Sequence, residues 1–337
     1  MSLELLGISV LWIFLFGYLI VGSIDFGAGF FSLYSDWTGQ KHILHKMIQR
    51  YLSPVWEVTN VFLVFFFVGI VGFFPKTAYY FGSALLVPAS ISIILLAIRG
   101  SYYAFGTYGS KENKVYSFIY GITGVLIPAS LTTVLTISEG GFLAIDKSGV
   151  HLKLKELLTS PYSWSVVLVS LVSVLFISAA FLTYYARQAE DNKAEQLVRR
   201  YTLGWSIPSV AAGVLVFYAL RSHNPEHFAR MADVSWMFVA SLVFFIAAIT
   251  LFYKQRAYGV AFFAVVMQYF TAFLAYGISH YPYLLYPVLT IYDGFTNKTM
   301  AIYLVVAFIA GLLLLIPALY LLLKLFLFNR KYVKGME

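Results

Sequence analysis

The first two apolar segments of the chain contain the runs Tyr18-Leu-Ile-Val-Gly-Ser-Ile-Asp-Phe-Gly-Ala-Gly29 and Ser53-Pro-Val-Trp-Glu-Val-Thr-Asn60. Each run places one carboxylate, Asp25 or Glu57, inside an otherwise apolar helix candidate, and the third segment holds Arg99 in the same way. A charged side chain at membrane depth costs at least ~2.5–3.5 kcal/mol, so such groups usually face a partner, a cavity or an ion path. We therefore take these three residues as the candidate functional centre.

The composition is that of an integral membrane protein. Of the 337 residues, 61% are hydrophobic and only 11% are charged, whereas soluble domains carry about 25% charged residues. The absence of cysteine excludes thiolate metal sites, iron–sulfur clusters and disulfides. The formal net charge of +8 arises largely from Lys and Arg in short loops. This distribution indicates a membrane orientation and no nucleic-acid partner.

Nine apolar segments are long enough to cross a bilayer, which takes about 20 residues. The loops and tail after the odd-numbered segments hold 14 Lys and Arg residues, against 7 on the opposite side. Because basic residues accumulate in cytoplasmic loops, we expect the N-terminus outside and the C-terminus in the cytoplasm. The expected fold is an all-α polytopic membrane protein with one membrane domain over 1–337. The segments are 5–34, 54–73, 77–105, 115–138, 163–187, 201–221, 231–254, 257–280 and 301–327.

The three charged residues are expected at similar depths in the cytoplasmic half of the membrane. At the helical rise, Asp25 lies ~14 Å, Glu57 ~6 Å and Arg99 ~9 Å from the cytoplasmic ends of their segments. A carboxylate in a medium of low dielectric can bind and release protons near neutral pH, which favours a proton-transfer site fed from the cytoplasm. The polar residues on the same helix faces are Asn60, Ser92, Tyr102 and Tyr103.

Structural roles explain the same charges differently. Glu57, in the first turn of its segment, would stabilise the helix dipole by ~0.3–1 kcal/mol. Arg99 can extend to lipid headgroups, or it can neutralise Asp25 or Glu57 in a buried pair. Ser53 is expected to cap the second helix, with Pro54 at its first position. In the loop 139–162, the run His151-Leu-Lys-Leu-Lys-Glu-Leu-Leu158 predicts a short surface helix.

The histidines do not predict a redox centre in this chain. All six fall in loops or at helix ends, whereas a haem within the membrane needs axial ligands at that depth. His223 and His227 flank Glu226 and could bind a metal, but without a third ligand they predict a solvated loop. The sequence therefore predicts no metal site, no cofactor-binding residue and no catalytic residue in this chain.

A family resemblance emerges from the two opening runs. Gly22-Ser-Ile-Asp-Phe-Gly-Ala-Gly29 and Ser53-Pro-Val-Trp-Glu-Val-Thr-Asn-Val-Phe-Leu63 resemble the two N-terminal signatures of subunit II of cytochrome bd-type quinol oxidases. Arg99 matches a third landmark of that subunit. The resemblance covers the whole chain in architecture, while its specific motifs lie in the first 100 residues. By motif position it implies a proton path formed by Asp25, Glu57 and Arg99, with Trp56 and Asn60 as supporting residues.

The resemblance also implies partners and an architecture. The quinol site and the b- and d-type haems would belong to a subunit I, so this chain would bind no haem and would not be catalytic alone. The complex would oxidise quinol and reduce oxygen to water in the bacterial cell membrane. The chain would form two pseudo-symmetric four-helix bundles, 1–138 and 163–280, with a peripheral ninth helix at 301–327. A structural quinone, membrane lipid and a small single-helix subunit are further partners that it allows.

The chain departs from the family pattern at two places. Some members have Asp where this chain has Glu57, and some carry a further acid just after the arginine, where this chain reads Gly100-Ser-Tyr-Tyr103. Tyr102, Tyr103 and Lys111 are candidate substitutes for that acid. Two hypotheses from other classes stay open: a proton-coupled membrane transporter, and a purely structural membrane partner whose three charges form a buried network.

Overall fold

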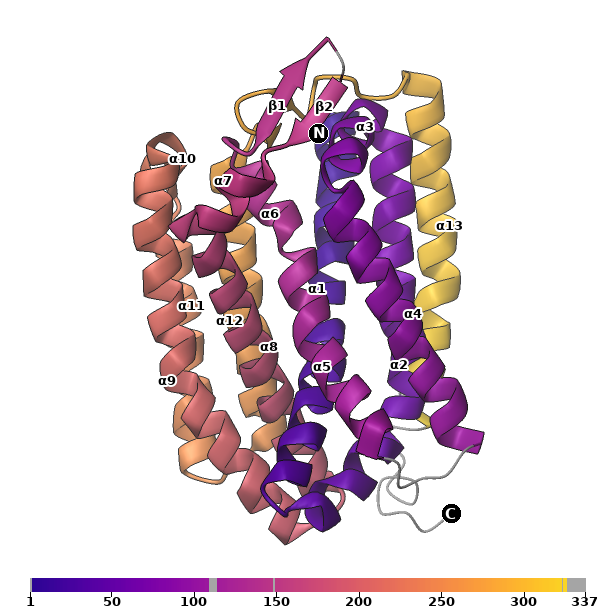
Figure 1. Ribbon diagram of the computed structural model, residues 1–337, viewed down its shortest axis with the longest axis vertical. Coiled ribbons are helices and arrows are strands. Elements are labelled where there is room, and N and C mark those ends of the chain that lie inside the picture. Colours follow the sequence, from indigo (N-terminus) through magenta and orange to yellow (C-terminus); the bar gives the residue numbers. More distant parts are fainter. Residues whose placement is uncertain (1, 109–113, 148, 323, 326–337) are drawn as a thin grey trace.

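The computed structural model describes residues 2–108, 114–147, 149–322 and 324–325. Long helices run side by side (Figure 1), and the hairpin of β1 and β2 lies at the end where α1 begins, which we call the N-terminal end of the bundle. The helices are α1 (Leu3–Trp37), α2 (Lys41–Phe73), α3 (Pro75–Ala84), α4 (Leu86–Tyr108), α5 (Lys114–Leu131), α6 (Thr133–Ser138), α7 (Leu154–Thr159), α8 (Pro161–Gln188), α9 (Asn192–His223), α10 (Pro225–Met231), α11 (Ser235–Tyr253), α12 (Tyr258–His280) and α13 (Lys298–Leu322). The strands are β1 (Leu143–Asp146), β2 (Gly149–Leu152), β3 (Tyr283–Leu285) and β4 (Leu289–Thr290).

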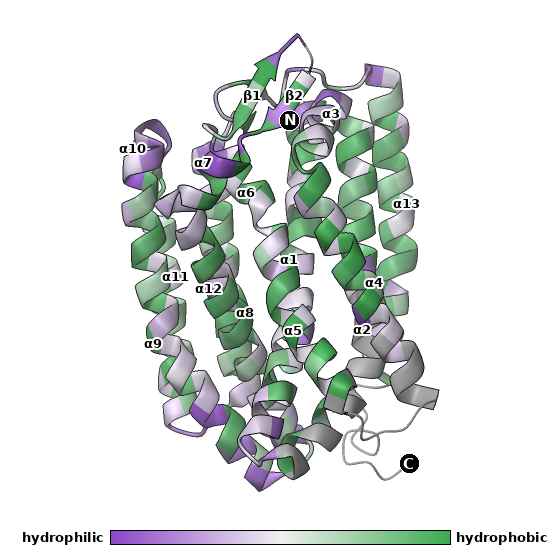
Figure 2. Ribbon diagram, in the orientation of Figure 1, coloured by the Kyte–Doolittle hydropathy of each residue, from purple (hydrophilic) through white to green (hydrophobic). Residues whose placement is uncertain are grey.

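Apolar helices dominate the molecule. Within the described residues, seven helices are long and apolar enough to cross a membrane, or eight if the bent pair α2 and α3 counts as one span. Helix α4 adds a shorter apolar stretch, Leu86–Ser101. Figure 2 shows the hydrophobic colouring along the middle of the helices, with hydrophilic residues gathered near their ends. The prediction of an all-helical polytopic membrane protein is confirmed at this level.

The segment expected as one span over 77–105 is divided into α3 and α4 at Leu85. An unbroken helix would need an amide hydrogen on Pro88 for the carbonyl of Ala84, and proline has none. Pro88 instead lies in the first turn of α4, where that hydrogen is not required. The carbonyl of Pro88 accepts a hydrogen bond from Ser130 Oγ at 2.8 Å. Helix α5, which contains Ser130, therefore supports α4 close to the break.

Helix α2 begins earlier than the sequence indicates. It starts at Lys41, so Ser53 and Pro54 lie inside it, and the predicted cap at its start is wrong. The early turns are held by burial, because Leu44 and Ile48 are only 0% and 1% exposed. Tertiary packing therefore extends the helix across a position where proline would favour a start.

Helix α1 lies at the centre of the helices that position the charged residues, and it packs against α2, α5 and α8. Two glycines allow close approach. A Cβ on Gly27 would lie 2.3 Å from Ser178 Cβ, and a Cβ on Gly124 would lie 2.3 Å from the Phe26 carbonyl oxygen. Small residues at such contacts let helix backbones meet in membranes, so α5 and α8 are brought against α1 next to Asp25.

The loop 139–162 contains more structure than the single predicted surface helix. Residues Leu143–Asp146 and Gly149–Leu152 form an antiparallel hairpin, and only Leu154–Thr159 is helical. His151 thus lies in a strand, and the prediction of a helix beginning there is wrong. The alternation of Val150, buried, with His151, exposed, fits a strand with one covered face.

Candidate functional site

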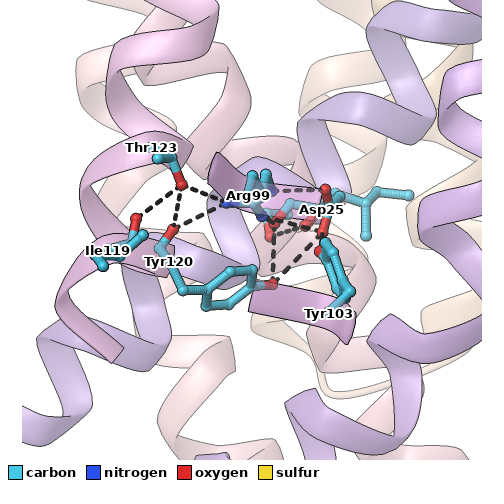
Figure 3. A network of polar contacts seen from close by, with 8 residues as sticks. Asp25, Arg99, Tyr103, Ile119, Tyr120 and Thr123 are labelled. Carbon is cyan, nitrogen blue, oxygen red and sulfur yellow. Dashed lines mark hydrogen bonds and ion pairs between the residues drawn. The ribbon is translucent and has the colours of Figure 1, made fainter. Parts of the chain in front are cut away.

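Asp25 of α1 and Arg99 of α4 form an ion pair inside the helices (Figure 3). Arg99 Nε donates to Asp25 Oδ2 and Nη2 donates to Oδ1, both at 3.0 Å. Nη2 also donates to the Asp25 backbone oxygen at 2.7 Å. The two residues are 1% and 0% exposed. A two-pronged contact of this kind is the strong and directional form of an arginine–carboxylate pair.

The remaining polar atoms of the pair are satisfied by α4 and α5. Tyr103, on α4, donates its hydroxyl hydrogen to Asp25 Oδ1 at 2.5 Å. Arg99 Nη1 donates to the Tyr120 backbone oxygen at 2.9 Å and to Thr123 Oγ1 at 3.2 Å. The Tyr120 ring faces the guanidinium, with its centroid 4.2 Å from Cζ. Buried charges persist where pairing and hydrogen bonds offset their desolvation, and this arrangement meets both conditions.

The structure brings together three of the eight residues that the sequence singles out: Asp25, Arg99 and Tyr103. Ser92 is 3% exposed, and its Oγ has no hydrogen-bond partner among the described residues. Asn60 is half-buried on α2. The other three, Trp56, Glu57 and Tyr102, lie in helices, but their side chains are outside the described part of the structure.

Tyr120 and Thr123 belong to the site and were missed by sequence reasoning. They stand three residues apart on α5 and therefore share one helix face. The chain has 26 tyrosines, so neither the residue type nor the spacing distinguishes this one. The two residues are identified only by their hydrogen bonds to Arg99, which lies on another helix.

Gly29 is expected to be sensitive to a single added methyl group. A Cβ there would lie 2.6 Å from the Tyr120 backbone oxygen and 3.1 Å from Arg99 Nη1. Gly29→Ala should therefore displace α5 or the guanidinium and destabilise the protein by about 1–3 kcal/mol, as overpacking does. The measurement is the thermal unfolding midpoint of the purified protein in detergent.

Gly213→Ala is the matched control, because a Cβ on Gly213 of α9 meets nothing within 4 Å. It should leave the midpoint unchanged or raise it, since alanine is favoured over glycine in a helix by up to ~1 kcal/mol. Equal midpoints for the two variants would show that the contact at Gly29 is not tight.

A second polar cluster lies at the N-terminal end of the bundle. Glu139, His227 and His280 are 2%, 0% and 7% exposed, so the prediction of a solvated loop at His227 is wrong. His227 Nδ1 lies 2.9 Å from Glu139 Oε1. Burial acts to raise the pKa of Glu139, but the hydrogen bond from His227 and the proximity of His280 outweigh it and hold that pKa below its ordinary value.

His223 is not in a solvated loop either. It ends α9, its ring stacks between Phe142 and Tyr162, and Nε2 lies 3.1 Å from the Gly140 oxygen. His223 and His227 therefore do not form a site together. His227 instead contacts Glu139, which is far away in the chain.

The fold and the buried charges define a class of protein: a polytopic α-helical membrane subunit with a compensated ion pair inside its helices. The chain belongs to the cytochrome bd terminal oxidase subunit II family, whose sequence model matches residues 3–326. The family resemblance of the opening runs is thereby confirmed. The chain is a subunit of a bd-type terminal oxidase, a haem-containing complex, which implies a subunit I as partner.

Two relatives support this assignment. The chain is 33% identical over 342 residues to the putative cytochrome bd menaquinol oxidase subunit II of Bacillus subtilis (strain 168), covering 99% of this chain and 98% of the relative. It is also similar to a chain in the structure of bd oxidase from Geobacillus thermodenitrificans, with 67% sequence identity and a TM-score of 0.85. That match covers 98% of this chain and 100% of the other.

Proposed function

We propose that this chain is a haem-free scaffold for subunit I and supplies a proton-uptake path from the cytoplasm toward the site of oxygen reduction. The observation that carries the proposal is the buried Asp25 carboxylate, which accepts hydrogen bonds from Arg99 and Tyr103 of α4. The Tyr103 hydroxyl is the next group in this chain of hydrogen bonds, and Tyr103 is half-buried rather than fully buried. A proton can pass between such groups through short hydrogen bonds.

The proposed location of the haems follows from the positions of the histidines in this chain, which are the candidate axial ligands. A haem inside the membrane needs an axial ligand at that depth. The histidines with described side chains end a helix or lie beyond the membrane-spanning helices; they are His151, His223, His227 and His280. We therefore place the b- and d-type haems, and the oxidation of quinol, in subunit I. A small single-helix subunit is a further proposed partner.

The proposed topology has nine crossings, made of the seven long apolar helices, α2, and α3 with α4. Two four-helix bundles would comprise 1–138 and 163–280, within a single membrane domain over 1–337. Helix α13 fits the role of the peripheral helix at 301–327, because only 6% of its apolar stretch is buried. The basic loops favour a cytoplasmic position, in a bacterial cell, for the end opposite the N-terminal end, so the N-terminus would lie outside.

An apolar pocket is the proposed place for a lipid or quinone chain. It lies between α1, α2, α5 and α8 and is lined almost wholly by hydrocarbon. Its lining includes Tyr18, Phe26, Leu63, Pro128 and Val174. An acyl or isoprenoid chain offers the matching apolar surface.

Glu57→Gln tests the path nearer to its proposed entrance. The substitution keeps the side-chain length and removes the titratable proton, so we expect quinol-driven oxygen consumption to fall several-fold while the haem spectrum of the purified complex is unchanged. Glu156→Gln is the control, because Glu156 is exposed on α7 at the other end of the bundle. Loss of haem from the Glu57 variant would assign this residue to assembly, and an unaltered rate would remove it from the path.

A further inference from the structure

The cluster of Glu139, His227 and His280 joins three separate elements. Glu139 directly follows α6, His227 lies on α10 and His280 is the last residue of α12. Figure 1 shows α6 and α10 at the N-terminal end of the bundle. One carboxylate oxygen and one nitrogen from each ring all lie within 4.8 Å of one another. The nearest member, Glu139, is 114 residues from Asp25 in the chain, and the proposed proton path does not use the cluster.

His280 is the group that the protein itself leaves unsatisfied. Its Nδ1 lies 3.4 Å from Glu139 Oε1, yet neither ring nitrogen has a hydrogen-bond partner among the described residues. The residue is only 7% exposed. A buried polar group without a partner is costly, so an imidazole fixed in this position indicates a ligand between the ring and the carboxylate.

The neighbours of the cluster are arranged as the outer shell of a metal site. Tyr276 donates its hydroxyl hydrogen to Glu139 Oε1 at 2.6 Å, and Asn224 Nδ2 donates to Oε2 at 2.9 Å. His227 Nε2 lies 2.8 Å from Ser279 Oγ, which leaves Nδ1 directed at the carboxylate. Metal-binding histidines typically use their second nitrogen in this way, and metal-binding carboxylates are likewise hydrogen-bonded.

The charge and spacing of the cluster also suit a cation. With neutral imidazoles, Glu139 leaves one uncompensated negative charge in a buried site. Arg230 Nε donates to the Ser279 carbonyl at 2.8 Å, and no ion pair joins it to Glu139 among the described residues. Tetrahedral ligands at zinc distances lie about 3.3 Å apart, and the observed separations from Glu139 Oε1 are 2.9 Å to His227 Nδ1 and 3.4 Å to His280 Nδ1.

We propose that Glu139, His227 and His280 bind a divalent transition-metal ion of the Zn²⁺ class, which ties α6, α10 and α12 together at the N-terminal end of the bundle. Two imidazoles and one carboxylate form a donor set used for zinc, and they are too few oxygens for calcium. The alternative is that no ion is bound and the three side chains are held by their mutual contacts alone. The two states differ in metal content, and that difference is measurable.

The first experiment is zinc binding to the intact oxidase complex, purified with an affinity tag that does not bind metal. After treatment with a chelator, Zn²⁺ is titrated in and bound zinc is measured by mass spectrometry, with haem iron as the internal count of complexes. We expect one tightly bound zinc per complex. The absence of stoichiometric zinc in the wild-type complex would overturn the proposal whether or not any variant folds.

Variants then locate the ion. Tyr276→Phe removes one outer-shell donor and should weaken zinc affinity by about 10–100-fold, while His280→Ala should weaken it further. His151→Ala is the control for surface binding, because His151 and Asp146 form an exposed pair 3.6 Å apart. Loss of bound zinc in the His151→Ala variant, together with retention of zinc in the His280→Ala variant, would contradict the proposed site.

X-ray absorption at the zinc edge on the wild-type complex supplies a test that needs no variant. The expected spectrum shows nitrogen and oxygen neighbours at about 2.0–2.2 Å, including two imidazole rings. A spectrum with fewer than two imidazoles would overturn the assignment.

Discussion

Arg99→Met is expected to destabilise the assembled complex by about 3–5 kcal/mol, the usual effect of removing one partner of a buried ion pair. Methionine approximates the volume of the arginine stem, so the loss comes from charge rather than from a cavity. The Asp25 carboxylate would stay buried at 1% exposure and would lose both side-chain contacts to the guanidinium. The measurements are the thermal unfolding midpoint in detergent and the yield of haem-containing complex from membranes.

The double variant Asp25→Asn/Arg99→Met separates charge from packing. Replacing both members of a buried pair with neutral groups is often close to neutral for stability, so we expect the double variant to recover most of the loss. Ser101→Ala is the control on the same helix, because Ser101 is exposed and, among the described residues, its hydroxyl bonds to the Ala97 oxygen of its own helix. An Arg99→Met complex as stable as wild type would show that the pair contributes little.

The charged pair illustrates what sequence reasoning could and could not supply. Helical rise placed Asp25 and Arg99 at compatible depths, and pairing was among the structural alternatives that the sequence left open. The sequence could not predict that α5 supplies hydrogen-bond acceptors to Arg99. Arg99 bonds there to the backbone oxygen of Tyr120, and every residue has such an oxygen. Which carbonyl is used depends on how α5 packs on α1, and hence on close contacts such as that at Gly124.

Helix boundaries were predicted less well than helix existence, for a physical reason. Proline at position 54 favours a helix start, yet α2 already runs from Lys41, because Leu44 and Ile48 in its early turns are buried. At Pro88 the same local preference prevails, and the helix breaks at Leu85. The balance between one lost backbone hydrogen bond and the burial of neighbouring side chains decides each case. The free energies on the two sides of that balance cannot be read from a single sequence.

The histidine cluster escaped prediction because its members are far apart in the chain. Glu139 and His227 are 88 residues apart, and a metal-site search by spacing considers near neighbours only. The pair that spacing did suggest, His223 with His227, is separated in the structure, because the His223 ring stacks on Phe142 and Tyr162. The loss of solvent exposure at His227 follows from α10 packing against both α9 and α12.

Asp25→Asn is expected to slow quinol-driven oxygen consumption by about one to two orders of magnitude, toward the lower part of the range for removing a proton-transferring side chain. Asparagine keeps the shape of the side chain and can still accept hydrogen bonds from Tyr103 and Arg99. It cannot take up and release a proton, so the proposed path would be interrupted while the haems stay in place. The measurements are oxygen consumption and the reduced-minus-oxidised haem spectrum of the same preparation, with Asp146→Asn on the exposed hairpin as the control.

The stability of this variant must be separated from its rate, because Asp25→Asn leaves the Arg99 charge without its counter-charge. The double variant Asp25→Asn/Arg99→Met makes the separation. If Asp25 carries protons, the double variant regains stability but stays slow, since neither neutral residue can relay a proton. If the pair serves only to hold α1, α4 and α5 together, oxygen consumption returns along with the unfolding midpoint. Partial recovery of the slow variants by a small membrane-permeant weak acid would further locate the defect in proton delivery, because such an acid bypasses the path without repairing the fold.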